Sequence, residues 1–105
     1  MQTQIVRGTA TKIREEGGQT IVSYHKTDVV KFTKKVITLN SGGWKTATTK
    51  NRMVQASNQF GLGFSVFQKQ GGWFVDPDTS DIMSEIVAFS DGMTIDRLTG
   101  EVVQG

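Results

Sequence analysis

The chain has 105 residues, of which 36% are hydrophobic and 21% are charged, and its formal net charge is +2. This length and apolar content predict a single domain over residues 1–105 with one buried core, and they exclude a disordered chain. The absence of cysteine excludes a disulfide framework and a thiolate metal site. No apolar run reaches membrane length and no signal-peptide core is present, so we expect a soluble, non-secreted protein without a membrane partner.

The charges are divided between the two halves of the chain. Residues 1–52 hold ten Lys or Arg and three Asp or Glu, whereas residues 53–105 hold two Lys or Arg and seven Asp or Glu. Because both halves share one core, the folded molecule is expected to have a polar charge distribution. A homo-oligomer that joins a basic face to an acidic face is one interpretation. A basic ligand face is another, and solvated loops without a partner are a third.

Runs of β-branched and aromatic residues predict four strands before the middle of the chain. These strands are expected within Gln2–Arg14, with a bend at Gly8, and over Thr20–Tyr24, Val29–Phe32 and Val36–Leu39. Glu15–Gly18 is predicted as a turn, and His25–Asp28 as a polar loop. Thr33, Lys34 and Lys35 would form the basic tip of a hairpin between the third and fourth strands. Val30, Phe32, Ile37 and Leu39 are expected to share its buried face.

One helix is predicted over about residues 49–60, where neither proline nor glycine interrupts the chain. Thr48 and Thr49 are suitable N-cap residues, because a threonine oxygen accepts a hydrogen bond from a first-turn N–H group. Gly61 stands where a left-handed residue commonly ends a helix. The apolar stripe expected to dock this helix on a sheet consists of Met53, Ala56 and Phe60.

The remainder of the chain predicts about four more strands. They are expected as a hairpin of Phe64–Lys69 with Trp73–Val75, a second hairpin of Ile86–Phe89 with Met93–Asp96, and a last strand ending near Val103. Thr79–Glu85 is read as one short helical turn or a loop. Trp73 and Phe74 should face opposite sides of their sheet, so both sides need a cover. The fold class is α+β: a strongly coiled or barrel-like antiparallel sheet of about eight short strands with one helix on it. A β-barrel with a helical plug is the alternative.

The start of the helix is the predicted ligand site. First-turn N–H groups lack an intrahelical partner and carry partial positive charge, so acidic residues usually accompany them. In this chain the helix start has basic and hydroxyl-bearing residues in place of acidic ones. A bound phosphate or carboxylate would supply the missing negative charge. The predicted binding residues are His25, Trp44, Lys45, Thr46, Thr48, Thr49, Lys50 and Arg52. Arg52 is expected to contribute most, because its planar guanidinium grips a phosphate with two hydrogen bonds. Solvated lysines beside capping threonines are the alternative.

Motifs of known catalytic and metal-binding types are absent from the sequence. The segment Trp44–Arg52 lacks the spacing of a P-loop, and no H-E-x-x-H or G-x-S-x-G is present. The acidic residues Asp76, Asp78, Asp81 and Glu85 lack the central glycine of an EF-hand loop. We therefore predict no catalytic residue, no metal site and no cofactor. His25, the only histidine, is expected at a turn or beside a ligand.

The runs TDVVKF and VITLNSGGW, with the Lys, Thr and Arg residues that follow up to Met53, resemble small uncharacterised proteins of tailed bacteriophages and prophages. The similarity extends from about Tyr24 to Val75. It implies a viral setting in the cytoplasm of a host cell. Phage proteins of this size include DNA-binding accessory proteins, inhibitors of host defence and oligomers that sequester a ligand.

Three functional hypotheses follow from the sequence. The first is a non-enzymatic binding protein, expected as a homo-oligomer, that holds a nucleotide or a nucleic acid by its phosphate at Lys45–Arg52. The second is a structural or assembly protein of a phage particle, in which the same residues form an interface. The third is an enzyme, for which no paired acid and base is recognised.

Overall fold

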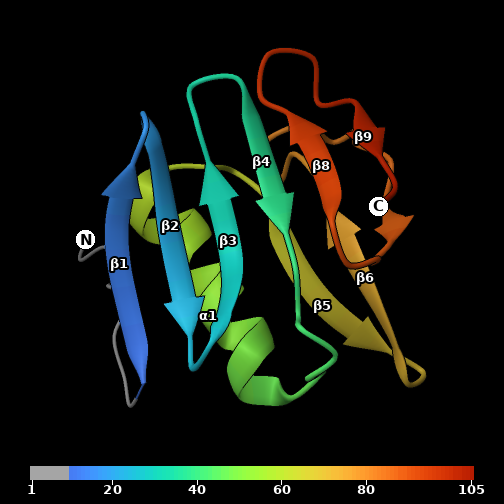
Figure 1. The fold of residues 1–105 in the computed structure, drawn as a ribbon. Coiled ribbons are helices and arrows are strands. Elements are labelled where there is room, and N and C mark those ends of the chain that lie inside the picture. Colours follow the sequence, from blue (N-terminus) through green and yellow to red (C-terminus); the bar gives the residue numbers. More distant parts are fainter. Residues whose placement is uncertain (1–9) are drawn as a thin grey trace.

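In the computed structural model, which describes residues 10–105, the chain forms nine strands and one helix (Figure 1). The strands are β1 (Thr11–Glu16), β2 (Gln19–Tyr24), β3 (Thr27–Phe32), β4 (Val36–Leu39), β5 (Ser65–Lys69), β6 (Gly72–Asp76), β7 (Val87–Ala88), β8 (Met93–Asp96) and β9 (Val102–Val103). The helix α1 (Ala47–Phe60) lies between β4 and β5. The predicted bend at Gly8, and the part of the first strand before it, lie outside the described residues.

The strands form two antiparallel sheets. Sheet A has six strands in the order β1-β2-β3-β4-β8-β9, and sheet B has three in the order β5-β6-β7. Figure 1 shows α1 behind the β1–β3 half of sheet A and sheet B behind its β4–β8 half. The helix contacts β2, β3 and β5, so helix and sheet B together form the second layer. The α+β class and the predominance of antiparallel pairing are confirmed.

The predicted barrel-like single sheet is wrong. Sheet A ends at β1 on one side and at β9 on the other, and sheet B is separate from it. The predicted hairpin of Ile86–Phe89 with Met93–Asp96 is also wrong, since β7 pairs with β6 and β8 pairs with β4. The segment between them crosses from one layer to the other. At its start the Phe89 N–H donates to the Trp73 carbonyl in sheet B, and at its end the Gly92 N–H donates to the Leu39 carbonyl in sheet A.

The first part of sheet A follows the predicted hairpins with one correction. The expected loop over His25–Asp28 is shorter, because Thr27 pairs with Tyr24 and Asp28 pairs with Ser23 in the β2–β3 ladder. The register then shifts between Val22 and Ser23, which leaves Val29 as an extra residue on β3. Val29 and its neighbour Val30 are both fully buried as a result.

The helix starts earlier than predicted. Its N-cap is Thr46, not Thr48 or Thr49, because Thr46 has an extended backbone (φ −102°, ψ 162°) and its side chain accepts the Thr49 N–H at 3.2 Å. Thr48 and Thr49 are already helical. At the other end Gly61 has φ +64° and its N–H donates to the Ser57 carbonyl, which confirms the predicted left-handed end.

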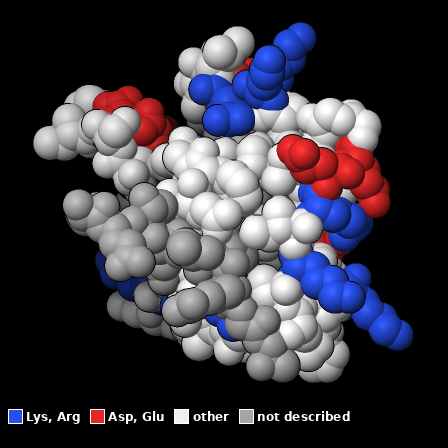
Figure 2. Space-filling view, turned by 90° about the vertical axis from the view of Figure 1, so that its left-hand side faces the viewer, with Lys and Arg blue, Asp and Glu red and all other residues white. Residues whose placement is uncertain are grey.

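Exposed charges gather partly by sign. On the face shown in Figure 2, Lys and Arg form one group at the top, and a separate projection at the upper left carries Asp and Glu. Elsewhere the signs alternate: Arg14 of β1 pairs with Glu16 at 2.8 Å and reaches across β2 to Asp28 at 3.1 Å. The hydrogen bonds to Asp28 and then to Glu16 raise the pKa of Arg14.

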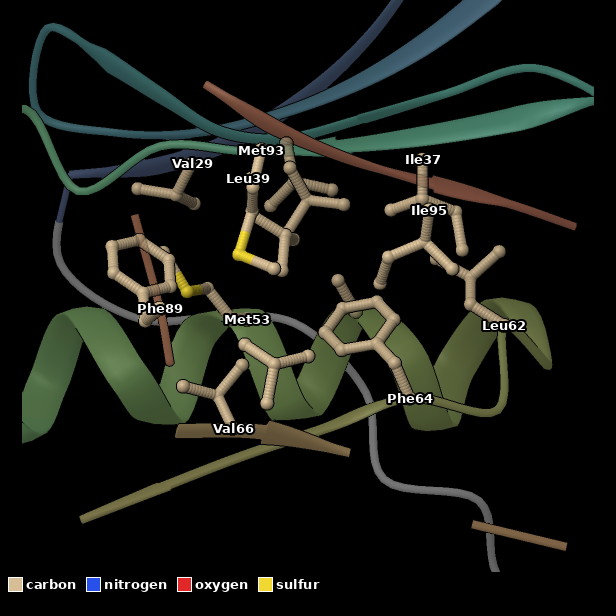
Figure 3. Packing of buried hydrophobic residues seen from close by; sticks show 14 of the residues in the cluster. Val29, Ile37, Leu39, Met53, Leu62, Phe64, Val66, Phe89, Met93 and Ile95 are labelled. Atoms are coloured by element: carbon tan, nitrogen blue, oxygen red, sulfur yellow. The ribbon is translucent and has the colours of Figure 1, made fainter. Parts of the chain in front are cut away.

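The core lies between sheet A and the second layer. Figure 3 shows Ile37, Leu39, Met93 and Ile95 of sheet A directed toward Met53 of the helix and Phe64 beside sheet B. The predicted stripe on α1 is confirmed: Met53 and Ala56 are fully buried, and Phe60 packs against Phe32 with ring centroids 5.1 Å apart. Two polar residues, Thr49 and Ser57, are buried on the same face, and the Ser57 hydroxyl donates to the Phe64 carbonyl at 2.6 Å.

The two aromatic neighbours in β6 face opposite sides of sheet B, as predicted. Trp73 is buried in the core and meets Phe89 edge-on at 5.4 Å, whereas Phe74 is half-buried and stacks on Phe67 at 6.0 Å. Residues 77–86 form a loop with turns, without a helix. Within residues 10–105, the helix is too short and too polar to cross a membrane.

Candidate functional site

A pocket of about 540 Å³ lies between the β2–β3 turn and the start of α1. Three segments of the chain form its walls: the turn with the beginning of β3, the loop after β4, and the first turn of the helix. The residues that line it are Tyr24, His25, Lys26, Thr27, Val29, Ser41, Trp44, Thr46 and Thr49. Of the eight predicted binding residues, the pocket therefore brings together His25, Trp44, Thr46 and Thr49.

The β2–β3 turn supplies rings and a cation. His25 has a left-handed backbone with φ +57°, which lets the chain reverse in two residues. Its N–H donates to the Ala10 carbonyl at 2.8 Å, and its ring lies 4.4 Å from the ring of Tyr24. Lys26 follows at the exposed tip. The turn thus places two rings and an ammonium group at one wall of the pocket.

The loop after β4 holds Trp44 in an exposed position. Ser41 is buried and anchors the loop, because its N–H and its hydroxyl both donate to Asp91 at 2.7 Å. The Trp44 N–H returns to the Ser41 carbonyl at 3.0 Å, and the Thr46 N–H donates to the Trp44 carbonyl at 2.9 Å. Trp44 is 69% exposed, although its backbone is fixed on both sides. A large apolar ring is therefore presented to solvent at the pocket.

The start of the helix completes the pocket. The Thr46 hydroxyl lies 3.1 Å from the hydroxyl of Thr49, and Thr49 is buried. Ala47 and Thr48 lie in the first turn of α1, so their N–H groups have no carbonyl partner within the helix. The first turn contains no acidic residue. This end of the pocket therefore favours negative charge.

The other predicted residues do not line the pocket. Lys45 directs its Nζ toward Phe89, 5.8 Å from the ring centroid, and Thr48 and Lys50 are half-buried beside the pocket. The Arg52 Nε donates to Thr11 at 2.8 Å and its guanidinium lies 5.7 Å from the Tyr24 ring centroid. Arg52 also donates to Gln55 at 3.2 Å, so its donors are directed along the helix and to β1.

Five lining residues were not predicted from the sequence: Tyr24, Lys26, Thr27, Val29 and Ser41. Tyr24 and Lys26 flank His25 in the chain, so predicting a two-residue turn at this point would have indicated them as well. Val29 reaches the pocket through the β-bulge, and Ser41 through its contact with Asp91. Neither the β-bulge nor the contact between Ser41 and Asp91 can be recognised from a local pattern in the sequence.

The pocket combines flat apolar surfaces with weak positive charge. Three rings (Tyr24, His25 and Trp44) suit a planar ligand, and Lys26 with the helix start suits an anionic group. Among residues 10–105, no group of three or more His, Asp and Glu is arranged to hold a metal ion.

Comparison with known proteins places the chain in a family. The model of the Kyanoviridae Gp96 protein family matches residues 3–96, which include every residue of the pocket. The chain belongs to this phage protein family. The family match confirms the resemblance to phage proteins found in the sequence. Searches of curated proteins and of solved structures gave no match.

Proposed function

We propose that this phage protein is a non-enzymatic binding protein whose pocket holds a small ligand with a planar ring and a phosphate or carboxylate group, such as a nucleotide. The observation that carries the proposal is the exposed Trp44 ring, held by a fixed backbone at the mouth of a pocket of about 540 Å³. Known ligand pockets have volumes of roughly 300–1,000 Å³.

The planar part of the ligand is assigned to the rings. Stacking of a base on an aromatic side chain contributes about 1–3 kcal/mol per base, and it needs an accessible ring face. Trp44 offers such a face, and Tyr24 and His25 stand on the opposite segment of the pocket wall. A ligand between these segments would bury apolar surface that the free protein exposes to water.

The anionic part of the ligand is assigned to Lys26 and the helix start. Arg52, which was expected from the sequence to contribute most, already donates to Thr11 and Gln55. We therefore assign it a smaller contribution to binding the anionic group than Lys26. Lys26 is exposed, lines the pocket, and has no such bond in the described residues. The N–H groups of Ala47 and Thr48 add partial positive charge.

Calorimetric titration with a nucleotide panel, and with short DNA and RNA at two salt concentrations, tests the proposal. A nucleotide in the pocket predicts weak salt dependence, whereas a nucleic acid predicts a slope of about −0.9 per phosphate neutralised on duplex DNA. Trp44→Ala should weaken binding by about 1–3 kcal/mol. Lys26→Ala should weaken it more than Arg52→Ala, and Lys12→Ala on β1 is the matched control.

Two results would contradict the binding proposal: no binding by any of these compounds, or equal binding by the parent and Trp44→Ala. A phage structural or assembly protein would then be the better assignment. Exposed apolar side chains favour this second candidate, because an interface would cover them. They are Ile82, Met83, Ile86, Leu98 and Val103.

A further inference from the structure

The loop of residues 78–86, here called the acidic loop, exposes large apolar side chains. Ile82 is 98% exposed and Met83 is 84% exposed. Asp81 precedes them and Glu85 follows them. Neighbouring exposed apolar residues with charges at their rim are typical of a surface that contacts another protein.

Hydrogen bonds hold this loop in a defined shape. The Ser84 hydroxyl donates to Asp76 at 2.7 Å, and the Met83 N–H donates to Asp81 at 2.9 Å. The Ser80 hydroxyl donates to Asp78 at 2.6 Å and holds the pKa of that carboxyl below its ordinary value. These bonds fix the backbone of the loop, so that Ile82 and Met83 stay exposed.

Two neighbouring turns of sheet A form the opposite kind of surface, here called the basic tip. It consists of Lys34 and Lys35 between β3 and β4, and Arg97 and Leu98 after β8. The Arg97 N–H donates to the Lys35 carbonyl at 2.8 Å, which joins the two turns. Leu98, the residue after Arg97, is 84% exposed. The adjacent Asp96 carboxylate accepts hydrogen bonds from the N–H groups of Leu98 and Thr99 at 2.8 and 3.1 Å.

The basic tip and the acidic loop lie at the same end of the molecule, in different layers. The Arg97 guanidinium lies 5.7 Å from the ring centroid of Phe32, which packs on Phe60 in the last turn of α1. Just beyond that turn, the Gly63 carbonyl accepts the Thr79 N–H at 2.8 Å. Figure 1 shows the β3–β4 and β8–β9 turns together at the top of sheet A, in front of the second layer.

We propose that two copies of this chain associate through this end as a symmetric dimer, with each acidic loop on the basic tip of the other copy. The two-fold axis would lie at this end of the molecule, in the plane between sheet A and the second layer, so that it exchanges the sides on which the two layers lie. It therefore places the tip of either copy opposite the loop of the other, and the contact occurs twice. Ile82 and Met83 would meet Leu98, while Asp81 and Glu85 would meet Lys34, Lys35 and Arg97. The ligand pocket, at the other end of α1, is left open.

Sedimentation equilibrium of charge-reversed variants tests the dimer. Lys34→Glu with Lys35→Glu, and separately Asp81→Lys with Glu85→Lys, should each raise the dimer dissociation constant by about ten-fold or more, because like charges would face each other. An equimolar mixture of the two double variants should dimerise again, since both of its contacts are attractive. Lys12→Glu with Lys69→Glu is the matched control and should leave the dimer unchanged.

The apolar contact has its own test. Ile82→Ser with Met83→Ser should also weaken the dimer, whereas Ile13→Ser on the exposed side of β1 should not. All these positions are exposed, so circular dichroism should show an unchanged fold. The parent protein remaining monomeric at tens of micromolar, or charge-reversed variants that dimerise like the parent, would overturn the proposal. Assemblies larger than two would overturn the two-fold arrangement.

Discussion

Ser41 donates two hydrogen bonds to one carboxylate oxygen of Asp91, 50 residues away in the chain: its N–H and its hydroxyl both lie 2.7 Å from Asp91 Oδ1. Ser41 is buried and lines the pocket between the β2–β3 turn and the start of α1. Asp91 lies in the segment that crosses from sheet B to sheet A. The contact therefore ties the loop that carries Trp44 to the junction of the two layers.

Asp91→Ala is expected to lower the free energy of unfolding by about 1–2 kcal/mol, because the buried N–H and hydroxyl of Ser41 lose a charged acceptor. Urea denaturation measures this loss. Asp91→Asn keeps one acceptor oxygen and should cost less. An unchanged denaturation midpoint for Asp91→Ala would show that water replaces the carboxylate without loss.

Gly42→Ala should destabilise the protein for two reasons. Gly42 has φ +64°, and a Cβ atom there would collide with the side chain of Thr27 across the pocket. We expect a loss of about 1–3 kcal/mol by chemical denaturation. Gly43→Ala is the matched control, because Gly43 has φ +83° but nothing within 4 Å of its Cβ position. Equal losses for the two variants would mean that Thr27 moves aside freely.

Met53→Asp is expected to destabilise the fold by about 4 kcal/mol or more, since it buries an unpaired carboxylate. Met53 has no exposed surface and lies where the helix faces sheet A. Met53→Leu, which nearly conserves volume, should cost less than about 1.5 kcal/mol. Thermal unfolding measures both. A melting temperature of Met53→Asp close to that of the parent would refute the docking of α1 through this face.

The Asp96 carboxylate links stability to pH. The N–H of Thr99, and then that of Leu98, hold the pKa of Asp96 below its ordinary value of 3.8. A lowered pKa in the folded state means that the carboxylate stabilises the fold above 3.8 and loses this effect as the pH falls through the folded-state pKa. Urea midpoints of the parent should therefore fall in that window. The urea midpoint of Asp96→Asn should fall less steeply over this pH range. Parallel plots of midpoint against pH for the two proteins would contradict the assignment.

Local patterns in the sequence were sufficient for the helix and for the hairpins that close within a few residues. The spacing of Met53, Ala56 and Phe60 predicted the buried face of α1, because helical periodicity alone decides which side chains share a face. Likewise, the β3–β4 and β5–β6 pairs were predicted from alternation and turn residues. The N-cap was misplaced by two or three residues, since Thr46, Thr48 and Thr49 are equivalent by type and only backbone conformation separates them.

The pairing of β7 and β8 was not predictable from local patterns. A turn with Asp91 and Gly92 suits a hairpin, yet Phe89 packs on Trp73 in sheet B while Met93 pairs with Leu39 in sheet A. Burial of both side chains between the layers requires the chain to cross there, and hydrophobic contact of distant segments decided it. The same crossing separates one expected sheet into two.

The sequence by itself determined the residue types at the helix start, the family resemblance and the opposite charges of the two halves. Tertiary structure decided which of those residues meet. Trp44 and His25 share a pocket because Ser41 is held by Asp91 and because the β2–β3 turn lies across the pocket from the N-terminus of α1. Arg52 is directed elsewhere because Thr11 of β1 accepts its Nε–H. Contacts between segments distant in the chain set these directions, and periodicity and capping describe only neighbours in the chain.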